Sequence, residues 1–233
     1  MTKSLAYSWQ KKYIGQVHKE FEIQTVAFHD KTVHYTVLND SHIQKNYQML
    51  LHGQEREIYD RITAAQRRAQ FAASRIMARH IMGREDEIGR DDAGMPLWPK
   101  GWQGSIAHKD KVVGVCIQKD NKPIGIDIEF AEIDLRLSEK ILNTWELKKI
   151  KIDERSLAIY FSAKEASYKA LYPILKEKFY FQDIEIINID RCEVSLQFAK
   201  QNLITKFPHK IACDYAEIFI ENSEFIFSLC SSH

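Results

Sequence analysis

Residues 123–130 read PIGIDIEF, an apolar run that contains two acids. Isoleucine fills every second position, which is typical of a β-strand with one apolar face. Side chains two apart on a strand share a face, so Asp127 and Glu129 point the same way, with Cα atoms roughly 6.6 Å apart. Two such charges repel by roughly 2–3 kcal/mol at about 6 Å and an effective dielectric near 20. Either solvent or a cation must offset this repulsion.

The composition is that of an ordinary soluble globular protein. The 233 residues, 45% hydrophobic and 28% charged, suffice for one domain or two compact halves. A net charge of +1 argues against a strongly basic nucleic-acid binder. The four cysteines have no metal-like spacing, which favours a reducing compartment, although their even count leaves bridges open. With no apolar signal-peptide core in residues 1–13 and no run long enough to span a membrane, we expect a cytoplasmic protein.

The first half of the chain predicts two strands and then a long helix. Residues 20–40 favour two strands joined near position 30. The apolar periodicity of residues 57–82 predicts one helix, with Gly83 as its C-cap. Residues 84–108 contain prolines and glycines and predict a shaped loop.

The second half predicts strands on either side of a helical region. The run at 112–118 predicts a strand before the 123–130 strand, and residues 136–172 are mainly helical in pattern. A β-meander is expected over 183–189, 192–198, 210–220 and 224–230. We predict an α+β fold with two similar halves, residues 1–122 and 123–233.

A second acidic motif lies at residues 161–171, FSAKEASYKAL. Ser162 and Glu165 have the spacing of a capping box, which predicts Ser162 as the N-cap of a helix. Glu165 and Lys169 are four apart and can form a helix ion pair. These two features give Glu165 a sufficient structural role without any chemistry.

Taken together, the two motifs point to a metal site. Asp127, Glu129 and Glu165 could supply carboxylate oxygens to a hard cation such as Mg²⁺, which keeps water and binds substrate phosphate. Lys169 would face the same phosphate. Neither motif contains histidine or cysteine, which argues against zinc.

GIDIE followed downstream by an aromatic-S-x-K-E-x-x-x-K helix resembles the 4′-phosphopantetheinyl transferase superfamily, and FSAKE is closest to its enterobactin-synthetase type. Residues 94–108, GMPLWPKGWQGSIAH, are similar to a third block of that family. Residues 67–75, RRAQFAASR, resemble its arginine-bearing helix, with Ser74 at a position usually held by glycine. The blocks stand in the family's order.

The resemblance implies a pseudo-twofold α+β monomer that binds coenzyme A in an active site between its halves. It implies Mg²⁺-dependent transfer of 4′-phosphopantetheine from coenzyme A to a serine of an apo acyl or peptidyl carrier protein, with release of 3′,5′-ADP. The subtype favours siderophore or nonribosomal peptide biosynthesis, and no nucleic-acid or membrane partner is expected.

Catalytic and metal-binding roles follow from the same resemblance. Asp127, Glu129 and Glu165 are the implied metal ligands. Glu165 is also the candidate base for the acceptor serine, directly or through a water. Lys169 would neutralise the bridging phosphate or protonate the leaving group.

Coenzyme A binding is implied for side chains in three blocks and for Arg90, which shortly precedes the block that begins at Gly94. They are Arg67, Arg75, Arg90, His108, Lys164 and Lys169. Arginine suits phosphate because its planar fork holds two oxygens at once. Lys164 is open between a phosphate contact and an exposed side chain.

Residues 131–158 carry apolar side chains and lysines and are expected to form part of the carrier-docking surface. Two other functions remain open. A different Mg²⁺-dependent nucleotide-diphosphate enzyme would share the acids but need no docking segment. A catalytically silent coenzyme-A-binding protein would not need intact acids and Lys169.

Overall fold

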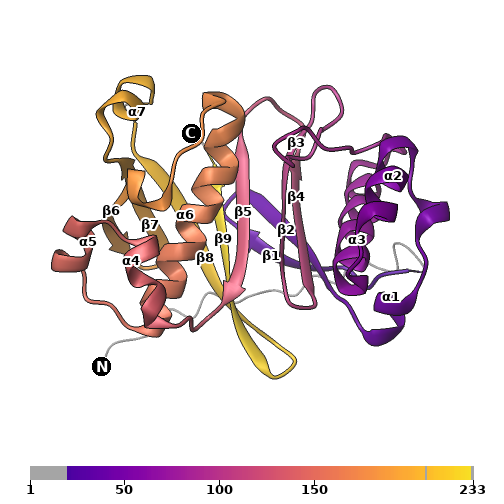
Figure 1. Cartoon of the computed structure of the whole chain (residues 1–233), viewed down its shortest axis with the longest axis horizontal. Coiled ribbons are helices and arrows are strands. Elements are labelled where there is room, and N and C mark those ends of the chain that lie inside the picture. Colours follow the sequence, from indigo (N-terminus) through magenta and orange to yellow (C-terminus); the bar gives the residue numbers. More distant parts are fainter. Residues whose placement is uncertain (1–19, 208, 232–233) are drawn as a thin grey trace.

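Two antiparallel β-sheets form the centre of the computed structural model, which describes residues 20–207 and 209–231 (Figure 1). The first sheet has the strand order β1-β2-β4-β3 and the second the order β5-β9-β8-β7-β6. The first contains β1 (Gln24–Phe28), β2 (Lys31–Val37), β3 (Gln103–Lys109) and β4 (Val112–Gln118). The second contains β5 (Ile124–Phe130), β6 (Ile184–Asp190), β7 (Glu193–Phe198), β8 (Ile211–Ile220) and β9 (Ser223–Ser231).

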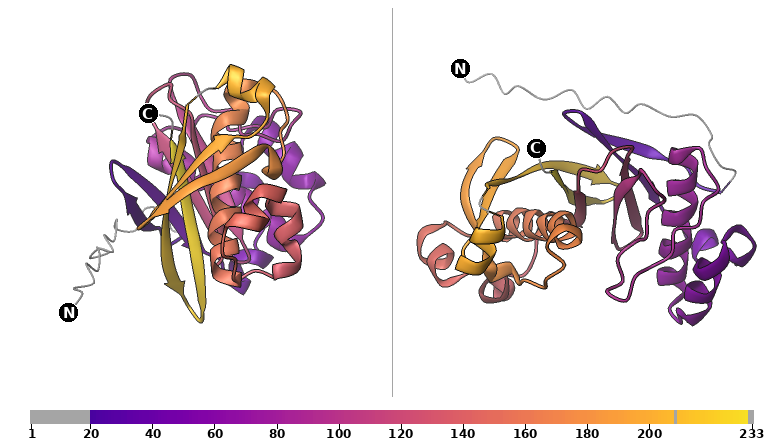
Figure 2. Two further views of the ribbon diagram at one scale, coloured as in Figure 1. Left: turned by 90° about the vertical axis from the view of Figure 1, so that its left-hand side faces the viewer. Right: turned by 90° about the horizontal axis from the view of Figure 1, so that it is seen from above.

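One long helix accompanies each sheet, α3 (Ala65–Met82) the first and α6 (Glu154–Leu175) the second. Figures 1 and 2 show β3 and β5 between these two helices. The shorter helices are α1 (Asp40–Gln44), α2 (Gly53–Arg61), α4 (Ser138–Ile141), α5 (Thr144–Lys149) and α7 (Gln201–Lys206). Single 3-10 turns are η1 (Gln48–Leu50), η2 (Leu135–Leu137) and η3 (Phe181–Asp183). No helix in the described ranges is long and apolar enough to cross a membrane.

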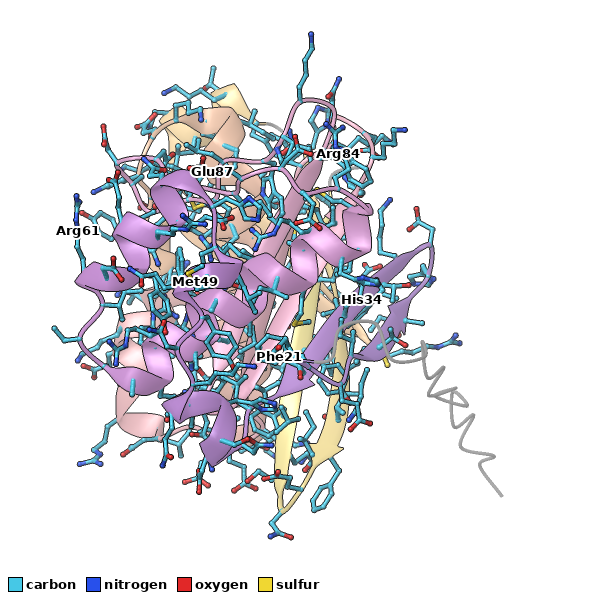
Figure 3. The ribbon with its side chains drawn as sticks, turned by 90° about the vertical axis from the view of Figure 1, so that its right-hand side faces the viewer. Phe21, His34, Met49, Arg61, Arg84 and Glu87 are labelled. Atoms are coloured by element: carbon cyan, nitrogen blue, oxygen red, sulfur yellow. The ribbon has the colours of Figure 1, made fainter. Side chains whose placement is uncertain are left out.

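The helical side of the N-terminal half differs from its prediction at one point. Instead of a single helix over 57–82, α2 and α3 are separated because Ile62 and Ala64 adopt extended backbone angles. Ile62 still packs on the same core cluster as α3, so the apolar periodicity continues where the helix does not. Gly83 ends α3 in a left-handed conformation with φ 63°, as predicted. Figure 3 views this side, with Met49 at the surface.

The helix α6 begins earlier than the capping-box pattern predicted. Its N-cap is Asp153, whose side chain accepts a hydrogen bond from the Ser156 amide at 2.7 Å. Ser162 is therefore not the N-cap, and Glu165 lies in the interior of the helix. Residues 157–160 are buried in the core, so packing extends the helix upstream of Ser162.

Alternation along β5 divides its side chains between two environments. Its isoleucines enter a core between the sheets, where they meet Val33 of β2 and Phe227 of β9. Asp127 and Glu129 lie on the other face and line a cleft together with residues of α6. The shared face of the two acids is thus as the strand pattern predicted.

The two sheets approach each other along β3 and β5, where Ser105 Oγ accepts a hydrogen bond from the Ile126 amide at 3.0 Å. The α+β class is confirmed, with one antiparallel sheet and one long helix in each half. Residues 103–108, predicted as part of a loop, belong to β3. The predicted boundary after residue 122 falls in the turn between β4 and β5, and the division into two domains stays a prediction.

Gly125 determines how closely α6 can pack on β5. A Cβ atom at this position would lie 1.9 Å from the Ala166 carbonyl oxygen and 2.6 Å from the Ala170 amide nitrogen. Both atoms belong to the backbone of α6, so no side-chain rotation could relieve the clash. The absence of a side chain lets the helix lie directly on the strand that carries Asp127.

We therefore expect Gly125→Ala to lower the free energy of unfolding by about 3 kcal/mol, measured by urea denaturation. Gly114→Ala is the matched control. Its Cβ would meet the end of the Ile128 side chain at 2.6 Å, and this flexible atom can move. We expect the control to cost about 1 kcal/mol. Equal losses in the two variants would contradict the close-packing account.

Candidate active site

A cleft of about 430 Å³ lies between the two long helices, with β3 and β5 contributing to its lining. Five cationic side chains and three acids line it, together with His108. The cations are Arg67, Arg75, Arg90, Lys109 and Lys169, and the acids are Asp127, Glu129 and Glu165. Apart from Lys164, every candidate site residue named from the sequence lines this one cleft.

The two strand acids are each paired with a lysine from a different element. Lys169 Nζ, from α6, lies 2.7 Å from Asp127 Oδ1 and also donates to the Ile126 carbonyl at 3.0 Å. Lys109, from β3, forms an ion pair with Glu129. Asp127 and Glu129 are only 8% and 6% exposed, so solvent alone does not screen their repulsion. The two ammonium groups offset it.

Glu165 lacks such a partner in the part of the chain that the structure describes. The predicted Glu165–Lys169 helix pair is wrong, because Lys169 reaches across to β5 instead. Burial raises the pKa of Glu165, and the nearby charge of Asp127 raises it further, while Lys169 opposes the shift. A carboxylate with a raised pKa beside two other acids is suited to accept a proton.

The three acids fit a hard divalent cation by their chemistry, because carboxylate oxygens are the donors that Mg²⁺ prefers. Their neighbourhood already contains positive charge in the form of Lys109 and Lys169. Within the described ranges, no group of three acidic, histidine or cysteine side chains is gathered closely enough to hold a metal ion. A cation would therefore have to compete with the two lysines for these oxygens.

The other end of the cleft is an arginine cluster around Phe71. The guanidinium carbon of Arg75 lies 4.0 Å from the centre of the Phe71 ring, and that of Arg90 lies 5.3 Å from it. Arg67, one helical turn before Phe71, donates to Gln70 Oε1 at 3.2 Å. Among the described residues, none of the three arginines forms an ion pair with an acid. Cations without acidic partners in a cleft are suited to bind an anion.

Burial shifts the pKa values of two arginines in this cluster. It lowers the pKa of Arg75 to about 9, and the neighbouring charge of Arg90 contributes to the shift. Burial and Arg90 also lower the pKa of Arg67. The guanidinium of Arg75 is held in place by Ser74 Oγ at 3.0 Å and the Ile88 carbonyl at 3.4 Å. An incoming anion would relieve the repulsion among these groups.

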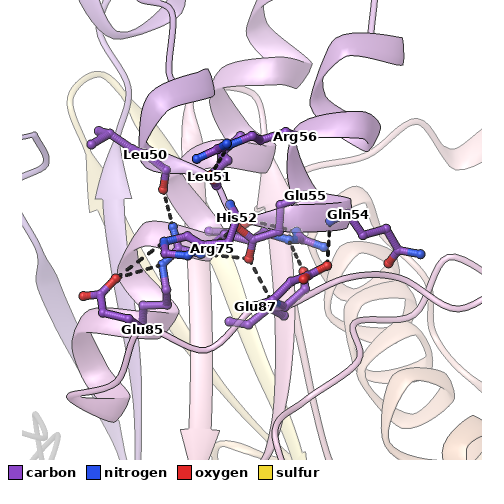
Figure 4. Close-up of polar contacts among 12 residues, drawn as sticks. Leu50, Leu51, His52, Gln54, Glu55, Arg56, Arg75, Glu85 and Glu87 are labelled. Carbon is purple, nitrogen blue, oxygen red and sulfur yellow. Dashed lines mark hydrogen bonds and ion pairs between the residues drawn. The ribbon is translucent and has the colours of Figure 1, made fainter.

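A buried ion pair behind the arginine cluster fixes the loop that carries Arg90 (Figure 4). Arg79 of α3 donates to both carboxylate oxygens of Glu55 at 2.8 and 2.6 Å, and also to the Leu50 carbonyl. Glu55 in turn accepts the Ile88 amide at 2.8 Å and the His52 amide at 3.0 Å. The pair thus joins α2, α3 and the start of the loop.

His108 lies on β3 between the arginine cluster and the acids. Burial, Arg67 and Lys169 lower its pKa to about 3. The imidazole is therefore neutral at physiological pH and presents one N–H donor and one acceptor.

Lys164 does not reach the cleft. Its side chain is fully buried and pairs with Glu146 at 2.8 Å, so it is neither a phosphate contact nor an exposed side chain. Lys109 and the Glu55–Arg79 pair were not recognised in the sequence. Lys109 directly follows the GSIAH block, which is the only local signal; Glu55 and Arg79 depend on contacts that no spacing indicates.

Comparison with known proteins finds one family along both halves of the chain. A model of the 4′-phosphopantetheinyl transferase superfamily matches residues 123–219, and a model of the 4′-phosphopantetheinyl transferase N-terminal domain matches residues 55–118. With both halves matched in order, the chain belongs to the 4′-phosphopantetheinyl transferase superfamily. The enterobactin-synthetase type stays a prediction.

Two curated relatives carry the same family name. The chain is 32% identical over 133 residues to the 4′-phosphopantetheinyl transferase Npt of Nocardia iowensis, covering 52% of this chain and 59% of the relative. It is 30% identical over 141 residues to the 4′-phosphopantetheinyl transferase PptT of Mycobacterium tuberculosis, covering 53% and 60%. The matched region thus spans about three fifths of each relative's length.

We expect Glu55→Gln to destabilise the fold by about 3–5 kcal/mol, because it leaves the buried charge of Arg79 without its buried partner and with only the exposed Glu85 beside it. The control is Glu57→Gln on the same helix, whose ion pair with Arg61 joins side chains 68% and 80% exposed. We expect this control to cost at most about 0.5 kcal/mol. Urea denaturation of both variants measures the difference, and losses of similar size would contradict a structural role for Glu55.

We also expect His108 to stay neutral as the pH falls from 7 to 5, because its pKa of about 3 lies far below the ordinary value of 6.5. Between these two pKa values, the His108 imidazole binds a proton in the unfolded chain but not in the folded protein. This residue's contribution to stability is therefore lost as the pH falls from about 6.5 towards 3. An NMR titration of the imidazole, assigned with His108→Gln, measures the midpoint. A midpoint near 6.5 would show that the imidazole is not buried among cations.

Proposed function

We propose that this protein transfers 4′-phosphopantetheine from coenzyme A to a serine of an apo acyl or peptidyl carrier protein, releasing 3′,5′-ADP. The observation that supports this most directly is the division of charge in one cleft. Three acids stand at one end and three arginines without acidic partners at the other. A diphosphate that extends from the acids toward the arginines, together with a separate phosphate on the arginines, would match this division.

In this proposal, Arg67, Arg75 and Arg90 bind the 3′-phosphate and diphosphate of coenzyme A. The positions of Arg75 and Arg90 over Phe71 favour such a role because they hold two planar donor groups beside one another. His108, being neutral, would donate a hydrogen bond from its N–H without adding charge. Lys109 is a further cation that can contact a phosphate.

Asp127, Glu129 and Glu165 would hold Mg²⁺ in the proposed reaction. When bound, the ion would polarise the diphosphate oxygens and reduce their repulsion toward an incoming hydroxyl. Because Asp127 and Glu129 are buried, their negative charges favour a bound cation. Lys169, displaced from Asp127, would be free to contact the phosphate.

The proposed step is an in-line displacement at phosphorus. The serine oxygen forms a bond to the β-phosphorus of coenzyme A, and the bond from that phosphorus to the bridging oxygen breaks. Glu165, whose pKa is raised, accepts the proton of the serine hydroxyl. Lys169 stabilises the negative charge that the leaving 3′,5′-ADP carries. The remaining work of the protein is to hold the two reactants in line.

Within the predicted segment 131–158, the carrier protein would dock on the part that precedes α6, residues 131–151. Leu135, Leu137 and Trp145 are 42%, 39% and 50% exposed there, although large apolar side chains are usually covered. Lys140, Lys148 and Lys149 are exposed in the same segment, where Arg136 is paired with Asp134. An apolar patch beside these lysines suits a partner with an acidic, amphipathic helix. Siderophore or nonribosomal-peptide carriers, and a monomeric enzyme, stay predictions.

We expect Asp127→Asn to reduce transfer at least about 100-fold while leaving the fold intact, because the variant keeps its shape but lacks the charge that a cation needs. The assay incubates the protein with coenzyme A, Mg²⁺ and purified apo-carriers and records the mass gained by the carrier. Asp190→Asn, at the exposed end of β6, is the control and should transfer at the parental rate.

The same assay separates the proposed function from its rivals. Nucleotide release without mass gain on any carrier would indicate a hydrolase, and binding of coenzyme A without turnover would indicate a silent binding protein. Parental transfer by Asp127→Asn would overturn the assignment of Asp127.

A further inference from the structure

Lys164 and Glu165 are neighbours in sequence but point into different parts of the molecule. Successive residues of an α-helix are rotated by about 100°, so adjacent side chains cannot serve the same face. Glu165 lines the cleft. The side chains of Lys164 and its partner Glu146 are both 0% exposed, on the side of α6 that meets α4, α5 and η3.

The ammonium group of Lys164 is fully used within this contact. Its Nζ donates to Glu146 Oε2 at 2.8 Å, to the Ile141 carbonyl at 3.1 Å and to the Phe181 carbonyl at 3.0 Å. An ammonium group has three donors, so none remains for a phosphate. The three acceptors come from the end of α4, from α5 and from η3.

Both carboxylate oxygens of Glu146 also accept hydrogen bonds from the backbone. Its Oε2 also accepts the Asn143 amide at 2.7 Å, which closes the capping box of α5. Its Oε1 accepts the Ile186 amide of β6 at 2.7 Å. The pair therefore connects the helix that carries Glu165 to four other elements, α4, α5, η3 and β6, through one satisfied polar network.

Two of the helices that this pair contacts are too short to be stable in isolation. Helices α4 and α5 have four and six residues, far below the length at which an isolated helix is stable. Their position depends on anchors to the rest of the fold. Trp145 is half exposed beside Glu146, which is fully buried, so the anchor and the surface patch occupy adjacent positions of α5.

We infer that Lys164 is a positioning residue for carrier recognition, which fixes the docking surface of residues 131–151 relative to Glu165 and makes no contact with coenzyme A. This inference rests on the proposed function. The buried pair would set the distance between the surface that binds the carrier and the carboxylate that meets its serine.

The test uses the double variant Lys164→Met/Glu146→Gln, which leaves no buried charge unpaired. We expect kcat/KM for the apo-carrier to fall at least about tenfold, with the KM for coenzyme A within about twofold of the parent. Hydrogen–deuterium exchange should become faster in residues 131–151 and stay unchanged in α3. Trp145→Ala serves as a reference for the surface. Lys206→Met, which removes a more exposed ion pair with Glu177, serves as the control.

An unchanged kcat/KM for the carrier in the double variant overturns the inference, whatever the exchange shows. A rise in the KM for coenzyme A instead overturns it too, by returning Lys164 to phosphate binding. If Trp145→Ala alone lowers kcat/KM for the carrier, the docking surface stands and only the anchoring role fails. A parent chain that modifies no carrier overturns the proposed function itself.

Discussion

The direct packing of α6 on β5 is the constraint on which the site depends. Gly125 brings the helix backbone against the strand, and Lys169 then reaches Asp127, two residues further along the same face. A bulkier residue at 125 would separate the acids of the strand from Glu165. The buried like charges are tolerable because this packing and the approach of β3 deliver a lysine to each strand acid. The same packing of α6 and β3 beside β5 therefore both closes the fold and neutralises the buried acids.

Much of the fold could be predicted from local pattern, because the decisive periodicities were short. The alternating isoleucines of β5 predicted both the strand and the common face of Asp127 and Glu129. The predictions that failed concern where elements begin and end. Ile62 keeps the helical apolar spacing while its backbone leaves the helix. Ser162 has a capping spacing, but core contacts upstream of it extend α6 to Asp153. Tertiary packing decided both boundaries.

The site could be predicted as a set of residues but not as a set of contacts. Most of the implied residues line one cleft, because the family motifs mark the strand and helix positions that face it. The partners of these residues come from distant parts of the chain. Nothing in the sequence pairs Lys109 with Glu129, or directs Lys164 to Glu146 and away from the cleft. Two adjacent residues of a helix face different directions, and local spacing does not tell which one faces the site.

The two ends of the cleft are prepared for ligands in different ways. The arginines around Phe71 are charged groups with no acidic partner among the described residues, so an anion binding there breaks no ion pair. At the other end, Asp127 and Glu129 each already contact an ammonium group, so a cation bound there would compete with two lysines. A released lysine in a partly buried cleft needs a new anionic partner. A ligand that brings phosphate oxygens supplies that partner, so in the proposed reaction the binding of the metal and of the diphosphate favour each other.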